Sequence, residues 1–259
     1  MTNDTARLDR LAGSLRELHQ IGTPLLLINA WDGPSAKAVE AAGARAIATS
    51  SAAVAETRSA QDNNTASRVA FDVLRRVADL VSVPVTADLE GGYGLSGPDL
   101  VAALLGAGAV GCNIEDTDHD NGGTLLDAER HATYLQQIRT AATAAGVSVV
   151  INARIDTILH HPQRDARATM NETVRRAQLY MAAGADCVYP IGLRDPSIVK
   201  ELVDALACPV NVNPSPPFSA LAEAGAARIS TGAGTYRFMT AELERRARLM
   251  FEGDPKAFV

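Results

Sequence analysis

Short apolar runs rich in valine, isoleucine and alanine alternate along the chain with longer amphipathic stretches. Eight of these runs are continuously apolar, which is typical of strands in a parallel sheet with both faces covered. The clearest amphipathic stretches predict helices at residues 127–145 and 169–183, each followed by a glycine suited to a helix C-cap. We expect strands at residues 25–30, 44–50, 83–89, 110–114, 147–153, 185–189, 209–212 and 228–230.

The joint between helix and strand repeats along the chain. The segments Ala-Ala-Gly-Ala, Gly-Ala-Gly-Ala, Ala-Ala-Gly-Ala and Glu-Ala-Gly-Ala precede the second, fourth, sixth and eighth expected strands. Eight strand–helix units without a change of composition favour an α/β fold of the (β/α)8 type, a TIM barrel, over an open doubly wound sheet. Because such a barrel commonly has about 250 residues, we expect residues 1–259 to form a single domain.

Composition and charge narrow the classes of partner. The chain has 24 Lys+Arg against 30 Asp+Glu and a formal net charge of -6. Since no stretch concentrates basic residues, we expect no nucleic acid partner. No apolar run approaches the roughly 20 residues of a membrane span, and the first residues do not resemble a targeting segment. We therefore expect no membrane partner and a cytoplasmic location.

Polar side chains follow three neighbouring strands of the expected barrel, at the end where the active site of this fold lies. Since side chains alternate across a strand, those of each strand share one face and should meet at one mouth. Close carboxylates need a shared proton or cation, and an all-oxygen set suits Mg²⁺, with Mn²⁺ as an alternative. These residues are Asp88 and Glu90, then Asn113 and Glu115, then Asn152, Arg154 and Asp156.

Five segments around these strand ends resemble the isocitrate lyase and phosphoenolpyruvate mutase superfamily, especially its short members, methylisocitrate lyase and the phosphonomutases. The resemblance covers nearly the whole chain. It implies a Mg²⁺-dependent enzyme that stabilises the enolate of a 2-oxo acid while a carbon–carbon or phosphorus–carbon bond breaks. The matching segments are residues 29–32, 49–51, 88–94, 111–116 and 152–156.

The resemblance also implies roles for individual residues. Asp88 matches the direct metal ligand, next to the substrate, and Arg154 matches the arginine that pairs with the substrate carboxylate. The acids that hold metal-bound waters match Glu90, Glu115 and Asp62. The stretch that binds the carboxylate and oxo oxygen matches Ser50, Ser51 and Ala52.

Two further residues are candidates by position. Trp31 either lines the pocket or packs at the barrel rim. Asn213 either lines the mouth or belongs to a turn, because it precedes Pro214. We also expect Glu115 and Arg154 to lie beside the reacting groups.

The segment after the fourth strand departs from the family. Residues 116–124 read Asp-Thr-Asp-His-Asp-Asn-Gly-Gly-Thr, without the cysteine of the lyases or the lysine of the mutase. Lysine occurs only at Lys37, Lys200 and Lys256, so a Schiff-base mechanism also lacks its amine. His119 is the candidate acid/base, because imidazole transfers protons near neutral pH. An incidental histidine in a solvated loop is the alternative.

We therefore expect a Mg²⁺-dependent lyase that cleaves a carbon–carbon bond of a small 2-hydroxy or 2-oxo (di)carboxylate through a metal-stabilised enolate. Decarboxylation of an oxaloacetate-like acid falls within this expectation. The alternatives are phosphorus–carbon chemistry, as in phosphoenolpyruvate phosphonomutase or phosphonopyruvate hydrolase, and a non-catalytic barrel that binds 2-oxo acids. By analogy with the family, the last helix, residues 241–251, should swap between subunits of a homodimer or homotetramer.

Overall fold

The computed structural model describes residues 3–59, 67–160 and 166–257. Its parallel strands are β1 (Leu25–Leu27), β2 (Asn29–Ala30), β3 (Ile47–Thr49), β4 (Val85–Asp88), β5 (Gly111–Glu115), β8 (Val150–Ile155), β9 (Cys187–Pro190), β10 (Asn211–Val212) and β11 (Arg228–Ser230). Its helices are α1 (Asn3–Glu17), α2 (Gly33–Ala41), α3 (Ser51–Glu56), α4 (Ser67–Leu80), α5 (Gly97–Gly106), α6 (Ala128–Ala144), α7 (Thr157–His160), α8 (Ala166–Ala182), α9 (Pro196–Leu206), α10 (Phe218–Glu223) and α11 (Gly234–Phe251).

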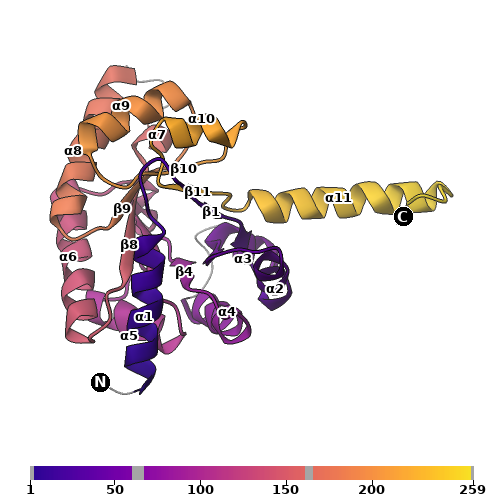
Figure 1. Cartoon of the computed structure of the whole chain (residues 1–259), viewed down its shortest axis with the longest axis horizontal. Helices are drawn as coiled ribbons and strands as arrows, with labels where there is room; N and C mark the ends of the chain where they lie inside the picture. Colours follow the sequence, from indigo (N-terminus) through magenta and orange to yellow (C-terminus); the bar gives the residue numbers. More distant parts are fainter. Residues whose placement is uncertain (1–2, 60–66, 161–165, 258–259) are drawn as a thin grey trace.

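The strands close into a ring. β2, β3, β4, β5, β8 and β9 pair in this order, and β1, β11 and β10 form a second parallel set. A bridge between Val188 and Val210 joins β9 to β10, and only Ile28 separates β1 from β2. β1 and β2 therefore act as one strand, and the expected eight-stranded (β/α)8 barrel is confirmed. In Figure 1, α6 and α8 lie outside β8 and β9.

Strand ends at the candidate mouth differ from the expected ones. β5 continues to Glu115 and β8 continues to Ile155, one and two residues beyond the expected ends. The register pairs Glu115 with Arg154 across these two strands. The sequence-based boundaries were wrong here because the charged side chains are paired at the mouth, so the backbone stays in the hydrogen-bonded ladder instead of turning toward solvent.

Residues 117–125 form a short antiparallel hairpin where the sequence predicted a loop. β6 (Thr117–Asp118) pairs with β7 (Thr124–Leu125), and the 3-10 turn η1 (His119–Asn121) lies between them. The Asp118 side chain caps this turn by accepting a hydrogen bond from the backbone N–H of Asn121 at 3.2 Å. The hairpin therefore gives His119 a defined place.

The opposite end of the barrel is packed by α1. Leu15 of α1 is fully buried and lies against Gly111, the first residue of β5, where an added Cβ would come within 2.7 Å of the leucine Cδ2. Only glycine allows this close approach. Arg16 of the same helix donates to the carbonyl oxygen of Val149 at 3.2 Å, just before β8.

Helix α11 leaves the barrel and extends away from the rest of the chain (Figure 1). It is longer than the helix expected at residues 241–251, and none of its residues is buried. Large apolar side chains such as Phe238, Leu243 and Phe251 are exposed. Among the described residues, no helix is both long enough and apolar enough to span a membrane.

Candidate active site

Three neighbouring strands bring the candidate site residues to one end of the barrel. The register places Asp88 of β4 beside Asn113 of β5, and Asn113 beside Asn152 of β8. Two residues further along, at the next inward-facing positions, Glu115 of β5 lies beside Arg154 of β8. The mouth that the sequence predicted is therefore built by β4, β5 and β8.

Asp88 is held by the start of the neighbouring helix. The Ser51 backbone N–H and hydroxyl both donate to Asp88 Oδ2, at 3.0 and 2.8 Å. The other carboxylate oxygen, Oδ1, is buried and has no hydrogen-bond partner among the described residues. A buried anionic oxygen without a partner is costly, so Asp88 is left with one oxygen ready for a cation or a donor.

The residues next to Ser51 differ in what they do. Ser50 caps α3, because its hydroxyl oxygen accepts a hydrogen bond from the backbone N–H of Ala53 at 3.3 Å. Ala52 follows in the first turn of this six-residue helix and is half-buried. The segment therefore lies beside Asp88, but only Ser51 contacts that carboxylate with its side chain.

A tight turn after β4 carries Glu90. Both Glu90 and Tyr93 adopt positive φ angles, 52° and 54°. At Gly92 an added Cβ would overlap the Tyr134 hydroxyl, so the turn requires glycine there. Burial raises the pKa of the Tyr93 phenol, and the negative charges of Glu90, Asp88 and Glu115 raise it further. The phenol thus lies within the electrostatic range of all three acids.

Glu115 is bound on both sides. One of its oxygens contacts Nε2 of His119, from the hairpin turn, and the other contacts Nη1 of Arg154. Burial raises the pKa of Glu115, while Arg154 and His119 oppose that shift. The hydrogen bond between His119 and Glu115 raises the pKa of the His119 imidazole. The structure therefore brings the three predicted catalytic residues into one contact chain.

Arg154 is fixed by a second acid. Its Nε and Nη2 donate to the two oxygens of Asp156, at 2.7 and 3.0 Å. Burial disfavours the charged guanidinium, but Glu115 and Asp156 outweigh that effect and raise the pKa of Arg154. A bidentate pair of this kind sets the plane of the guanidinium as well as its position.

A buried cluster behind the mouth holds Asp156 in place. Thr117 donates to Asp156 at 2.6 Å, and the Asp156 backbone N–H donates to Asp116 at 2.9 Å. Asp116 is fully buried and also accepts hydrogen bonds from Arg176 at 2.9 Å and Tyr180 at 2.7 Å. Asp116 therefore supports the site without facing it.

The family follows from the comparisons with known proteins. A family model described as phosphoenolpyruvate phosphomutase matches residues 15–251. The chain belongs to this family. An uncharacterized protein of Mycobacterium tuberculosis (strain ATCC 25618 / H37Rv) is 33% identical over 244 residues, which are 93% of this chain and 90% of that protein. The 2-methylisocitrate lyase of Bacillus subtilis (strain 168) is 25% identical over 82% of this chain and 70% of the lyase.

Solved structures agree with this family. A crystal structure from Burkholderia cenocepacia J2315, described as that of a phosphonomutase, is 38% identical, with a TM-score of 0.86 over 92% of this chain and 99% of that one. A phosphonopyruvate hydrolase solved with oxalate and Mg²⁺ shares the fold at 22% identity, with a TM-score of 0.79 over 94% of this chain and 88% of that one. The relatives of this chain thus include a protein named as a lyase and a structure described as that of a phosphonomutase.

Trp31 and Asn213 lie at the rim. Trp31 packs edge-on against Tyr236 of α11, with ring centroids 5.2 Å apart. Asn213 accepts a hydrogen bond from the backbone N–H of Gly192 and donates one to the Tyr189 hydroxyl. Asp62 lies outside the described residues. The sequence analysis did not single out Tyr189 as a site residue. Side chains alternate along a strand, and Tyr189 lies two residues after Cys187, so both side chains of β9 point into the barrel.

The donor set at the mouth fits a hard divalent cation. No group of three or more His, Cys, Asp or Glu within residues 3–59, 67–160 and 166–257 is arranged as a metal cage. Asp88 nevertheless offers a buried oxygen without a partner, and the carboxylates of Glu90 and Glu115 lie close by. Oxygen donors with room for water and substrate suit Mg²⁺.

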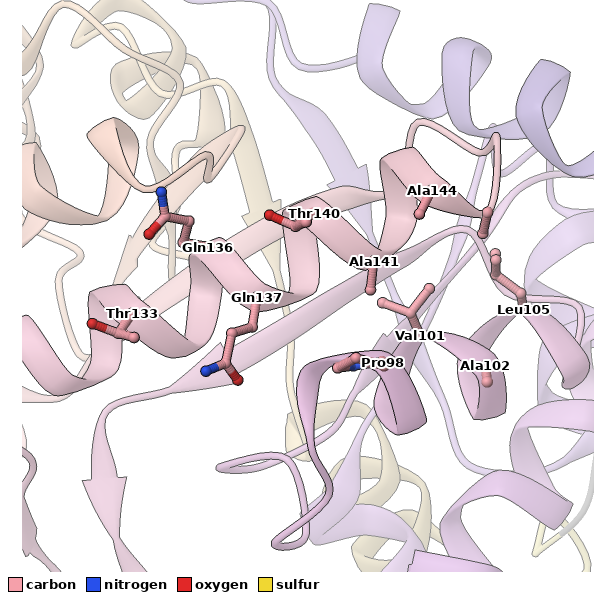
Figure 2. Close-up of a pocket in the computed structure, with 11 residues that line it drawn as sticks. Pro98, Val101, Ala102, Leu105, Thr133, Gln136, Gln137, Thr140, Ala141 and Ala144 are labelled. Carbon is pink, nitrogen blue, oxygen red and sulfur yellow. The ribbon is translucent and has the colours of Figure 1, made fainter.

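A separate groove of about 600 Å³ lies between α5 and α6 on the outside of the barrel (Figure 2). Val101, Leu105 and Ala141 line it with the amides of Gln136 and Gln137. None of the candidate site residues and no titratable side chain lines this groove. It therefore has no group for acid–base chemistry, and the mouth remains the candidate active site.

Proposed function

We propose that this protein is a divalent-metal-dependent lyase that breaks a carbon–carbon bond of a small 2-hydroxy or 2-oxo carboxylate through an enolate. The proposal is carried by one arrangement: Asp88 presents a buried oxygen without a partner at the same mouth as the oriented guanidinium of Arg154. A cation site beside an arginine is what binding of a 2-oxo carboxylate requires. Its membership of a family whose relatives include lyases supports the choice of reaction.

The proposed cation is Mg²⁺, with Mn²⁺ as the alternative. Asp88 would be its direct ligand, and Glu90, Glu115 and Asp62 would hold its waters. Bound there, the cation would polarise the oxo group and offset the charge of the enolate. Oxalate and Mg²⁺ in the similarly folded phosphonopyruvate hydrolase support the same pairing of ligand and metal.

Arg154 would bind the substrate carboxylate. A guanidinium has five N–H donors, and three of them go to Glu115 and Asp156. Nη1 and Nη2 each keep one further N–H, and these would donate to a carboxylate. The backbone of Ser50, Ser51 and Ala52 would complete the binding of the carboxylate and oxo oxygen.

His119 would be the acid/base of the reaction. The hairpin turn sets its ring against Glu115, at the mouth. Glu115 lies between this ring and Arg154, so a proton exchanged between His119 and the reacting carbon of a substrate held by Arg154 would pass through that acid. No lysine occurs in residues 116–124, so this segment offers no amine for the same step.

Phosphorus–carbon chemistry is the second candidate. It is favoured by the 38% identity with the structure described as that of a phosphonomutase.

The test is to incubate the protein with oxaloacetate, substituted malates, methylisocitrate and phosphonopyruvate, with Mg²⁺ or with EDTA, and to follow products by NMR. Metal-dependent cleavage of a carbon–carbon bond supports the lyase, and turnover of phosphonopyruvate alone supports the second candidate. Oxalate binding without any turnover would instead indicate a barrel that only binds 2-oxo acids.

We also propose that residues 1–259 form one domain and that α11 is exchanged between two copies in a homodimer or homotetramer. In a (β/α)8 barrel a helix covers the outer face of each strand. The outer side chains of the first strand, Leu26 and Ile28, are instead 52% and 43% exposed beside a hollow of about 340 Å³. The exposed apolar side chains of α11 from a second copy, such as Leu243, would cover this face.

A further inference from the structure

Tyr189 is a buried phenol at the mouth that the proposed function does not yet use. It is the Cα partner of Arg154 across β8 and β9, so both side chains point into the barrel from neighbouring strands. The residue is only 4% exposed. Burial raises the pKa of the Tyr189 phenol; the charge of Arg154 lowers it, and that of Asp88 raises it. The phenol is thus close to both charged groups that would hold the substrate.

Asn213 fixes the orientation of this phenol. The Gly192 backbone N–H donates to Asn213 Oδ1 at 2.7 Å, so the amide nitrogen must face the other way. That nitrogen donates to the Tyr189 oxygen at 2.9 Å. Because the phenolic oxygen is the acceptor in this bond, its own proton is directed to another acceptor.

The other hydroxyl beside the phenol is that of Ser230, whose hydrogen bond with Tyr189 lowers the pKa of the phenol. Ser230 Oγ already exchanges hydrogen bonds with the Asn211 amide, at 3.1 and 3.2 Å. An anionic ligand oxygen is a stronger acceptor than a shared hydroxyl. A ligand between Asp88 and Arg154 would therefore be the preferred acceptor for the hydroxyl of Tyr189.

We propose that Tyr189, oriented by Asn213, donates a hydrogen bond from its hydroxyl to an oxygen of the 2-oxo carboxylate bound between Asp88 and Arg154. This inference rests on the proposed function and adds a neutral donor to the two charged ones. It also gives Asn213 a positioning role, because its amide is engaged at both ends and acts on the substrate through the phenol. The ligand class is a small planar 2-oxo acid or its enolate, for which oxalate is a stable probe.

The test compares Tyr189→Phe with the unaltered protein by calorimetric titration of oxalate in the presence of Mg²⁺, and of Mg²⁺ alone. Loss of one hydrogen bond to a charged ligand should weaken oxalate binding by about 10- to 100-fold. Binding of Mg²⁺ alone should stay the same, since the phenol is no metal ligand. Asn213→Ala should weaken oxalate binding by less than Tyr189→Phe, because the phenol remains but is no longer oriented.

Tyr134→Phe is the matched control. Its hydroxyl donates to the backbone carbonyl of Leu95 at 2.9 Å and to none of the candidate site residues, so removing it should leave oxalate affinity unchanged. Oxalate affinity that is equal in Tyr189→Phe and the unaltered protein would overturn the inference while the proposed function stands. Equal losses for oxalate and for Mg²⁺ alone would also overturn it. If the unaltered protein with Mg²⁺ bound no oxalate, the proposed function itself would fail.

Should Tyr189→Phe fold poorly, Asn213→Ala decides the question by the same titration. The thermal midpoint of Asn213→Ala distinguishes a positioning role of Asn213 from a structural one. A bond that only joins β9 to the loop after β10 would change stability without changing oxalate affinity. Unchanged oxalate affinity in a folded Asn213→Ala protein would contradict the positioning role.

Discussion

Replacing Arg176 by methionine tests the buried support behind the mouth. Arg176 is only 6% exposed, and it supplies the cation that faces the fully buried carboxylate of Asp116 at 2.9 Å. Methionine fills a similar volume but leaves that charge without its partner. Removing one member of a buried ion pair costs about 3–5 kcal/mol. This is a large part of the roughly 5–15 kcal/mol that stabilises a typical domain.

The effect should depend on pH in a defined direction. Burial raises the pKa of Asp116, and the nearby Asp156 charge adds to that shift. A carboxyl with a raised pKa in the folded state favours its protonated form, so its cost is relieved at low pH and grows as pH rises through the folded pKa. The free energy lost by Arg176→Met should therefore be larger at pH 8 than at pH 5.

Urea denaturation at both pH values measures these losses, with Arg175→Met as the control. Arg175 is the preceding residue on the same helix, and it pairs with Glu172 and Glu129 at the surface. Exposed pairs of this kind contribute about 1 kcal/mol or less. A loss below about 1 kcal/mol for Arg176→Met at pH 8, or a larger loss at pH 5, would refute the reasoning. The double variant Asp116→Asn with Arg176→Met should recover part of the stability, because the buried Asp116 carboxylate that lost its partner is then removed as well.

Four further outcomes are expected. Asp88→Asn should abolish Mg²⁺ binding in calorimetric titrations, and retained binding would contradict the metal assignment. His119→Gln should lower turnover by about 100-fold or more while oxalate affinity is kept; unchanged turnover would remove its acid/base role. Burial lowers the pKa of His131 to about 3, so the stability gained from its neutral ring is present above pH 6.5 and is lost as pH falls, by about 1.4 kcal/mol per unit. His131→Gln should flatten that slope in denaturant titrations between pH 6.5 and 5, and an unaltered slope would exclude this histidine. Leu243→Glu in α11 should shift the mass in solution toward the monomer, as read by light scattering; an unchanged mass would contradict exchange of this helix.

The barrel and the place of its mouth follow from the sequence because both depend on local pattern. Continuous apolar runs reveal strands covered on both faces, and polar residues at their ends fall where parallel strands finish together. The break at Ile28 and the hairpin around His119 could not be predicted in the same way. The break depends on the pairing of β1 with the distant β11, and the hairpin strands β6 and β7 have two residues each, too few to show a pattern of their own.

Some site residues could likewise be predicted from the local sequence, and others could not. The contact of Arg154 with Asp156 could be expected, since the two lie on one face of a strand. For Asn213 the sequence left a pocket or a turn as alternatives. The structure gives it a third place, because its amide meets a phenol from β9 and a backbone N–H from the following loop. Tyr189 itself was hidden in an apolar run, where an aromatic side chain is usually a packing residue.

Trp31 is the only tryptophan in the chain, and its ring rests against Tyr236 in the first turn of α11. The same indole stands at the rim of the mouth, at the end of β2. Its emission spectrum is therefore an intrinsic optical signal for two events. A shift on dilution would follow separation of the copies, and a shift at constant protein concentration would follow ligand arrival.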